Sequence, residues 1–216
     1  MTLELRNVSK RVAGDDWIYP IDLVLESGRF NMLLGTTLAG KTTLMHLMAG
    51  LEKPDEGEIV RACRISFPLG FMGGVLPLLS ATENSRYIAQ LYGLDPDYVE
   101  AFCRWVCDLE EYFDRPLGTY SAGMKARFQF SLLLALEFDI YLIDEGMPRT
   151  TDANFNRKAG TILAERLKSA TVIIVSHQAD TLEKFARRAA VLKDGQFYQF
   201  DSLEEAKRLY DYETQG

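Results

Sequence analysis

The stretch "LLGTTLAGKTTLMHLMAGL", residues 33–51, decides the fold. It contains an apolar run, then a loop with glycines, and then apolar residues at the spacing of a helix. The loop from Gly35 to Thr42 fits the pattern G-x-x-x-x-G-K-[ST]. In that pattern backbone N–H groups surround phosphate oxygens, and glycines stand where side chains would obstruct them. The following helix N-terminus adds its dipole to the attraction of an anion. We therefore predict a strand, a phosphate cradle and a helix; the alternative is a glycine-rich turn with a surface lysine.

Individual residues of this cradle have expected tasks. Lys41 is expected to reach the outer phosphates of a nucleotide, and the hydroxyl of Thr42 is expected to meet Mg²⁺. The expected nucleotide-binding set is Gly35, Thr36, Thr37, Leu38, Ala39, Gly40, Lys41, Thr42 and Thr43.

Two further stretches could supply the rest of a nucleotide hydrolase, which needs an acidic metal ligand and a group that orients water. "FDIYLIDE", residues 138–145, is an apolar run that leads to Asp144, expected to hold the metal, and Glu145, expected to polarise the attacking water. Alternatively, the two carboxylates are a solvated pair at a strand end. His177 ends "TVIIVSH" at the strand edge where doubly wound sheets bind ligands. It could contact the outer phosphate or hold the water, or it could be structural.

Strand-like and helix-like segments alternate along most of the chain, which predicts an α/β fold with a mostly parallel sheet and helices on both faces. The stretch 81–136 contains only helical spacing and therefore predicts an inserted helical subdomain. The expected strands are 3–8, 21–26, 29–34, 57–60, 64–67, 138–144 and 170–176, with a hairpin at 189–200 that turns at Asp194-Gly195. The expected helices follow Lys41, cover 81–109 with a break at 93–97, open at Ser121, and cover 153–168 and 202–212.

Composition limits the class of protein. The 216 residues carry a net charge of −7, which argues against a non-specific nucleic-acid binder. The three cysteines, Cys63, Cys103 and Cys107, and the absence of a signal sequence predict a reducing cytoplasm. We expect buried thiols; the alternative is a metal pair at Cys103 and Cys107. No stretch approaches the length of a membrane-spanning helix, so we expect any work at a membrane to go through a partner.

The stretch "YSAGMKARFQFSLLLALEFDIYLIDE", residues 120–145, resembles a known family. Ser121-Ala122-Gly123-Met124, shortly before a strand that ends in Asp-Glu, resembles the signature motif of ABC transporter ATPases. The cradle, the Asp-Glu pair and His177 match the other family motifs in the family's order. The resemblance covers essentially the whole chain, and it implies a P-loop type sheet core with N-terminal antiparallel strands and an inserted helical subdomain.

Family membership would have several consequences for this chain. It implies one nucleotide-binding domain over 1–216, with a core of about 1–80 and 137–216 and a helical subdomain of about 81–136. It implies hydrolysis of ATP with Mg²⁺ by two copies closed head to tail, with Ser121, Ala122 and Gly123 of one copy capping the γ-phosphate in the cradle of the other. It also implies an integral membrane permease as partner, no nucleic acid, and a peripheral position on the cytoplasmic face of the bacterial inner membrane. Asp152 becomes a candidate at the dimer seam.

A narrower resemblance points to the ATPases that export capsular and related cell-surface polysaccharides. It is carried by "ISFPLGFMGGVLPLLSATENSRYIAQLYG" (65–93), "TYSAGMKARFQF" and "VSHQADTLEKFARRAAVLKDG". The region around the cradle is also similar to ATPases of sugar-uptake systems, so an uptake ATPase remains an alternative. A nucleotide-binding regulatory module without turnover is a further alternative.

Three positions depart from the family pattern. Val12 stands where an aromatic residue usually stacks on adenine, and Trp17 or Tyr19 could substitute for it. Leu76 stands where a glutamine usually meets Mg²⁺, and Ala122 replaces a commoner glycine or serine in the signature. Because residues 71–79 are strongly apolar, we expect them to dock a short amphipathic helix of the membrane subunit. The alternative is that they pack as core against 81–109.

Overall fold

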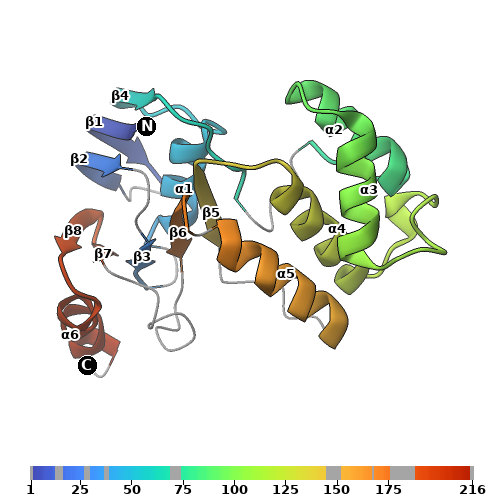
Figure 1. Cartoon of the computed structure of the whole chain (residues 1–216). Helices are drawn as coiled ribbons and strands as arrows, with labels where there is room; N and C mark the ends of the chain where they lie inside the picture. Colours follow the sequence, from blue (N-terminus) through green and yellow to red (C-terminus); the bar gives the residue numbers. More distant parts are fainter. Residues whose placement is uncertain are drawn as a thin grey trace. The chain divides into compact units, whose positions relative to one another are not determined.

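The computed structural model describes residues 2–12, 17–26, 30–36, 39–68, 74–144, 152–166, 168–175 and 188–214 (Figure 1). The chain divides into two compact units. The first, which we call the sheet unit, comprises Met1–Pro68, Phe138–Gly146 and Leu167–Gly216. The second, the helical unit, comprises Leu69–Glu137 and Met147–Arg166.

The sheet unit contains a three-stranded antiparallel sheet in the order β2-β1-β4. Its strands are β1 (Thr2–Arg11), β2 (Trp17–Glu26) and β4 (Glu56–Arg61). Alternate residues of β1 and β2, such as Leu3, Leu5 and Leu23, are buried, as the alternating sequence predicted. The expected N-terminal antiparallel strands are therefore present.

The main sheet of this unit has five strands in the order β5-β6-β3-β7-β8. They are β3 (Phe30–Leu34), β5 (Ile140–Asp144), β6 (Thr171–Val175), β7 (Arg188–Lys193) and β8 (Gln196–Phe200). The first four in the spatial order are parallel, and only β8 runs antiparallel, because it is joined to β7 by a two-residue turn. Asp194 and Gly195 both have positive φ angles, 47° and 73°, as a tight hairpin of this kind requires.

Alternation along β3 explains how the central strand joins two cores. Leu33 packs in the larger core, with helix α1 (Lys41–Ala49) and the antiparallel sheet. Met32 and Leu34 point to the other face and pack with Leu203 and Ala206 of helix α6 (Leu203–Thr214). The strand is thus covered on both faces, and this fixes the loop that follows Leu34.

The helical unit is built from α2 (Ala81–Leu91), α3 (Pro96–Cys107), α4 (Ala122–Ala135) and α5 (Ala153–Arg166), with a 3₁₀ turn at Leu117–Thr119. Side-chain caps begin these helices, and the one expected from the sequence, Ser121, is present. Ser80 and Glu83 form a reciprocal capping box before α2, Asp95 caps α3 ahead of Pro96, and Ser121 caps α4.

The three cysteines are free thiols, as expected. Cys103 and Cys107 are fully buried on α3. Burial raises the pKa of the Cys103 thiol and raises that of Cys107 to about 12, so both pack as small apolar groups. Among the residues that the structure describes, no helix is both long and apolar enough to cross a membrane.

The strand expected at 64–67 is wrong. The segment makes a single bridge, between Ile65 and Ile140, before Pro68 ends any further pairing. In place of a continued ladder, the fully buried Ser66 pairs with β5: its N–H donates to Ile140 O at 2.9 Å, and its Oγ accepts from Leu142 N–H at 2.8 Å. A side chain therefore completes the exposed edge of the sheet.

Replacing Ser66 with alanine is expected to leave the buried N–H of Leu142 without an acceptor. The free energy of unfolding should fall by about 1–3 kcal/mol, measured by urea denaturation. Ser131→Ala is the matched control, because the buried Ser131 hydroxyl only adds a bond to the helical carbonyl of Arg127. An equal loss in both variants would show that burial of a hydroxyl, rather than completion of the β5 edge, is what matters.

Candidate functional site

The predicted cradle is the corner between β3 and α1. Gly35 and Thr36 follow the strand, and Gly40 is the N-cap of the helix. Ala39 N–H donates to Thr36 O at 3.2 Å, which closes the loop, and Leu44 N–H donates to Gly40 O at 2.9 Å, which begins the helix. Thr37 and Leu38 lie outside the described residues.

Both glycines of the pattern answer a physical demand of this corner. A Cβ on Gly35 would lie 2.6 Å from the carbonyl oxygen of Leu192 on β7, so only glycine permits this approach. Gly40 has a φ of +90°, in the left-handed region, and a Cβ there would also lie 3.2 Å from Ile18. The two glycines are therefore required by the backbone conformation of the chain itself, in addition to leaving space for a ligand.

The start of α1 is electropositive. Lys41 is partly buried, and its Nζ donates to the carbonyl oxygens of Gly35 at 2.8 Å and Thr36 at 2.6 Å. In the described first turn of α1 no residue is acidic, and Gly40 offers no side-chain cap. The helix dipole and an ammonium group thus meet at one point, and this arrangement favours an anion. Thr42 is exposed and Thr43 half-buried in the same turn.

The parallel strands bring a second group to the same edge of the sheet. Asp144, the last residue of β5, pairs with Val175 of β6, and Val175 pairs with Leu33 of β3. Because neighbouring strands lie about 4.8 Å apart, the backbone of Asp144 lies roughly 10 Å across the sheet from Leu33. Glu145 and His177 follow the ends of β5 and β6 in sequence, and both lie outside the described residues.

A small hollow adjoins the cradle in the sheet unit. Its volume is about 100 Å³, and Gly35, Thr36, Lys193 and Tyr210 are among its lining residues. Val12 lies near Gly40, 3.5 Å from where a Cβ on that glycine would stand. Val12 packs against the apolar core, and its aliphatic side chain has no ring that could stack on adenine.

The two aromatic substitutes considered for Val12 differ in what the structure describes. Tyr19 is 54% exposed, and its N–H donates to Gly195 O at 2.7 Å, which links β2 to the β7–β8 turn. The side chain of Trp17 lies outside the described residues.

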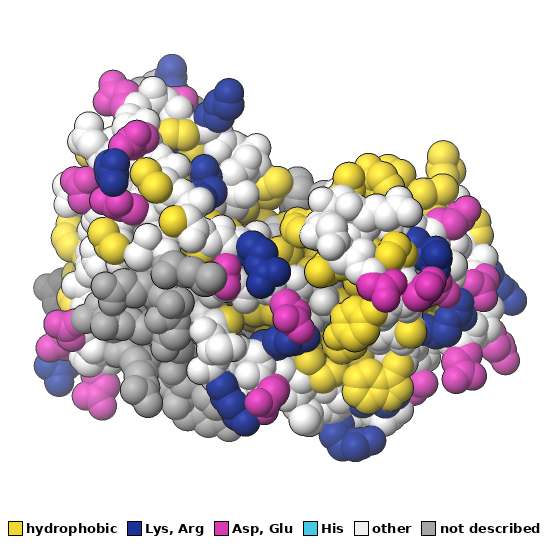
Figure 2. Space-filling view, turned by 45° about the horizontal axis from the view of Figure 1, so that its top comes forward, with side chains coloured by type: hydrophobic (Ala, Val, Ile, Leu, Met, Phe, Trp, Pro, Cys, Tyr) yellow, Lys and Arg dark blue, Asp and Glu magenta, His cyan; other side chains and the backbone are white. Residues whose placement is uncertain are grey.

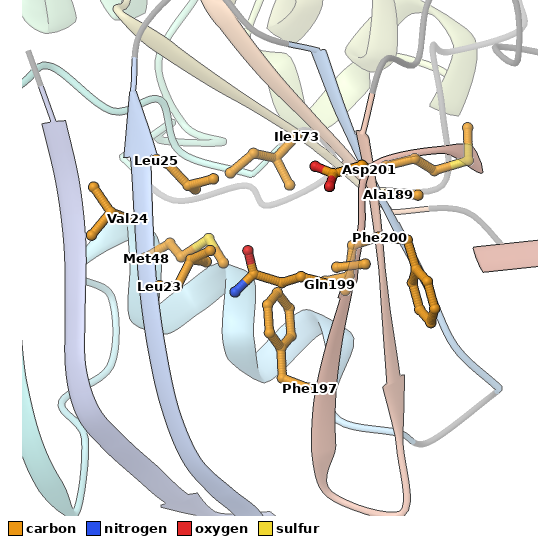
Figure 3. Close-up of a pocket in the computed structure, with 13 residues that line it drawn as sticks. Leu23, Val24, Leu25, Met48, Ile173, Ala189, Phe197, Gln199, Phe200 and Asp201 are labelled. Atoms are coloured by element: carbon orange, nitrogen blue, oxygen red, sulfur yellow. The ribbon is translucent and has the colours of Figure 1, made fainter. Parts of the chain in front are cut away.

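A larger pocket of about 150 Å³ lies elsewhere in the sheet unit, between β2 and the β7–β8 hairpin (Figure 3). The amide of Gln199 is directed into it beside Leu23 and Met48, and Phe197 closes one end. The cradle residues do not line it. Its walls are mostly core side chains, and they bring no cluster of reactive groups together.

The expected signature residues begin α4 in the helical unit. Ser121 has an extended backbone, and its Oγ accepts from Met124 N–H at 3.2 Å. Ser121, Ala122 and Gly123 are all exposed. A Cβ on Gly123 would meet no atom of the described chain within 4 Å, so the fold of one copy does not require glycine here. This helix start is available to a ligand or to a second molecule.

Asp152 is already engaged within its own unit. Its carboxylate accepts from Phe155 N–H at 2.9 Å, which caps α5, and it also forms an ion pair with Arg127 of α4. The bond from Phe155 N–H lowers the pKa of Asp152, and the charge of Arg127 lowers it further. Arg127 also donates to Asp108 O at 2.9 Å. These bonds join the C-terminal end of α3 and the start of α5 to α4.

The loop before α2 is rigidly held, although it carries exposed leucines. The buried Asn84 accepts from Leu76 N–H at 2.7 Å and donates to the carbonyl oxygens of Leu76 at 3.0 Å, Leu79 at 3.2 Å and Ser80 at 2.8 Å. Leu76 is 45% exposed and Leu78 90%. In the described part of 71–79, Val75 packs as core, while Leu76 and Leu78 face outward.

The same loop is bonded to the segment that leads into the signature. Leu117 N–H donates to Leu79 O at 2.9 Å, and Gly118 N–H donates to Pro77 O at 2.7 Å. Tyr120 follows, 4% exposed; its hydroxyl donates to Tyr112 O at 2.7 Å, and burial raises its pKa to about 12. These backbone hydrogen bonds join residues 77–79 to residues 117–118, which lie just before Ser121, the N-cap of α4.

Sequence reasoning missed Asn84 and Arg127, which organise the helical unit. Asn84 follows the Ser80 cap by four residues, so its amide can reach back over the loop, and this spacing was a usable signal. Arg127 stands among apolar residues of α4, where a buried charge requires a partner. Its partner Asp152 is distant in sequence, and no local pattern links the two.

Comparison with known proteins gives consistent results. Residues 18–147 match the family described as ABC transporter. The capsule polysaccharide export ATP-binding protein CtrD of Neisseria meningitidis serogroup B is 38% identical, over 97% of this chain and 98% of CtrD. The ATP-binding protein BexA of Haemophilus influenzae is 40% identical, over 99% of each chain. Both resemblances stated from the sequence are thereby confirmed.

A solved structure, the dimeric post-hydrolysis state of the ATP-binding cassette MJ0796 bound to ADP and Pi, shares the fold. Its TM-score is 0.74 at 22% identity, over 92% of this chain and 98% of that one. The expected fold class is therefore confirmed.

The glycines of the site give a sharp stability contrast. Gly35→Ala forces a Cβ against the backbone of β7 and should lower the free energy of unfolding by about 1–3 kcal/mol. Gly123→Ala adds a Cβ in open space on a helix and should leave stability unchanged or raise it by up to about 1 kcal/mol. Chemical denaturation of both variants measures the difference. Equal destabilisation would contradict the close approach of Gly35 to Leu192.

Proposed function

This chain belongs to the ABC transporter family, and we propose that it is the ATP-hydrolysing subunit of a transporter that exports a capsular or other cell-surface polysaccharide. The observation that carries the proposal is the corner from Gly35 to Thr42, where two glycines that the backbone requires, a lysine and an uncapped helix start converge. We infer the polysaccharide as substrate class from the relative CtrD, a capsule polysaccharide export ATP-binding protein, 98% of whose length this chain covers.

The residues divide the work as follows. Lys41 and the N–H groups at the start of α1 hold the phosphate chain. Asp144 holds Mg²⁺ together with Thr42, since a carboxylate and a hydroxyl are hard oxygen donors of the kind that Mg²⁺ prefers. When bound, Mg²⁺ would neutralise charge on the phosphates. Glu145 polarises the attacking water, and His177 contacts the outer phosphate or holds the water.

We assign the exposed start of α4 to a second copy of the chain. Ser121, Ala122 and Gly123 of one copy cap the γ-phosphate that lies in the cradle of the other. The open space at Gly123 supports this, because a phosphate or a partner's backbone needs clearance that the chain itself does not use. The two units act together as one nucleotide-binding domain over 1–216, with a core of about 1–80 and 137–216 and a helical subdomain of about 81–136.

The membrane subunit docks on the exposed leucines at 76–78. Asn84 holds their backbone, so the leucines are presented without being needed as core. The bonds from Leu117 and Gly118 connect this loop to the segment before α4, so a displacement of the loop by the partner is transmitted to Ser121. In this arrangement the chain lies peripherally on the cytoplasmic face of the inner membrane, and Leu76 replaces the usual contact with Mg²⁺ by contact with the partner.

A phosphate-release assay on purified protein tests the proposed reaction. Lys41→Ala should abolish ATP binding or turnover, because it removes the charge from the cradle.

Glu145→Gln should keep ATP binding but slow hydrolysis roughly 10²-fold or more. With hydrolysis blocked, ATP should hold two Glu145→Gln copies together in size-exclusion chromatography. Wild-type turnover in Lys41→Ala would refute the cradle, and absence of turnover in the wild type would favour a regulatory module.

Leu76→Asp should dissociate or uncouple the transporter, while the ATP affinity of the isolated subunit stays nearly unchanged. The fold should persist, because the loop is held through backbone groups and Leu76 is already 45% exposed. Leu51→Asp is the control, since Leu51 is 43% exposed in the sheet unit. Pull-down of the membrane subunit is the measurement. Undiminished complex formation and transport would eliminate the docking role.

A further inference from the structure

Exposed apolar side chains are concentrated in one part of the chain. Of the thirteen large apolar residues that are exposed in the described structure, eight lie between residues 76 and 112. Figure 2 shows hydrophobic side chains gathered over the helical unit. Such a concentration marks an interaction surface more often than chance exposure. The docking loop uses only Leu76 and Leu78 and leaves most of this surface unassigned.

The unassigned part is centred on α3. Tyr98, Phe102 and Trp105, at positions i, i+4 and i+7, form one line along the helix, which we call the α3 stripe. The rings of Tyr98 and Phe102 are 6.0 Å apart, and those of Phe102 and Trp105 are 6.1 Å apart. Tyr98 is 48% exposed and Trp105 55%. The rings therefore form a continuous outward-facing surface.

The α3 stripe is not needed for the packing of the helical unit. The buried side of α3 is made by Val99, Cys103, Val106 and Cys107, which are fully buried. A helix that is apolar on two faces is normally covered on both. Within the described residues, the outer face has only partial cover, from Lys158 of α5, whose Nζ lies 5.5 Å from the Trp105 ring centroid.

Acidic groups lie at both ends of the α3 stripe. Asp95 and Asp97 stand at the start of α3, and Asp108, Glu110 and Glu111 follow its end. Residues 81–115 contain eight acidic and three basic residues. Two of the three basic residues, Arg86 and Arg104, already pair with carboxylates of this unit. Lys158 adds one positive charge near Asp108, at 3.9 Å. The surroundings are thus acidic overall.

We propose that the α3 stripe binds the apolar face of a basic amphipathic helix in the cytoplasmic part of the membrane subunit. The acidic ends of the stripe complement lysine and arginine, and cytoplasmic segments of membrane proteins are rich in both. An anionic lipid surface would repel the same acidic groups, as would the stripe of a second copy. The inference rests on the proposed function for the existence of that subunit, and it adds a contact separate from the docking loop.

Trp105 itself provides a direct measurement. The chain has two tryptophans, so Trp17→Phe leaves Trp105 as the only indole emitter in the full chain. The probe is a synthetic 18-residue helix with leucines on one face and lysines on the other. Its binding should shift Trp105 emission to shorter wavelength, with at least tenfold higher affinity than a matched peptide that carries glutamates.

Variants and vesicles complete the peptide experiment. In the Trp17→Phe background, Tyr98→Lys should weaken the basic peptide at least tenfold, and Tyr198→Ser, a change at an exposed tyrosine of the sheet unit, should not. An unchanged emission maximum, or equal affinity for both peptides, would overturn the proposal. A blue shift with vesicles that contain anionic lipid but not with the basic peptide would overturn it in favour of a lipid surface.

The assembled transporter gives the decisive comparison. A stripe variant, Tyr98→Ser with Phe102→Ser and Trp105→Ser, should retain at least tenfold less membrane subunit after detergent extraction than Tyr198→Ser does. Tyr98→Lys is the milder second variant if the triple variant fails to fold. Equal retention of the membrane subunit by the wild type and the stripe variant would refute the binding role of the α3 stripe and leave the proposed function untouched. If the wild-type chain hydrolyses ATP but co-purifies with no membrane subunit, the proposed transport function fails, and with it this partner.

Discussion

The contact between Gly35 and β7 is the constraint on which the rest of the site depends. The backbone of the cradle approaches the carbonyl of Leu192 so closely that a Cβ would come within 2.6 Å of it. β3 can make this approach because it lies inside the sheet, paired with β6 on one side and β7 on the other. Its two faces are filled by α1 and α6, so the loop after Leu34 begins from a fixed point. A phosphate site formed by backbone N–H groups requires this fixed start, because backbone donors cannot adjust independently as side chains can.

The helical unit applies the same principle with side chains. Asn84 gathers one N–H and three carbonyls of the loop at 76–80, and Arg127 gathers the ends of α3 and α5 around α4. Asn84 is fully buried and the side chain of Arg127 is only 12% exposed, so an unsatisfied bond at either residue is costly. Their effect is to hold surface features in place, so Leu76, Leu78 and the start of α4 are exposed without being loose. Under the proposed function, which works through partners, such a surface is a functional element.

Local sequence patterns were enough to predict most of the fold. Alternation identified β1 and β2, an apolar run identified β3, the capping residue Ser121 identified the start of α4, and Asp194-Gly195 identified the hairpin. The cradle was predictable because its pattern is contained in eight residues, although the approach of Gly35 to Leu192 is not local and was not predicted. The failure at 64–67 has a different origin: Ser66 bonds to β5, more than seventy residues away, and short apolar runs do not show whether a partner strand is in register. Arg127 and Asp152 were not linked for the same reason. Glu145 and His177 remain predictions from sequence order at the strand ends.

The two bonds that Lys41 makes to the carbonyls of Gly35 and Thr36 have a consequence for how this corner responds to a ligand. The ammonium group already binds the backbone of Gly35 and Thr36, so this part of the loop surrounds a positive charge before any phosphate arrives. Entry of a phosphate is then an exchange, in which the lysine gives up neutral carbonyl oxygens for charged ones. At Gly35 and Thr36 the backbone is already held in this way, which lowers the entropic cost of binding at these two residues. The affinity of such a cradle for a phosphate depends on the difference in free energy between Lys41 bound to the two carbonyls and Lys41 bound to the phosphate.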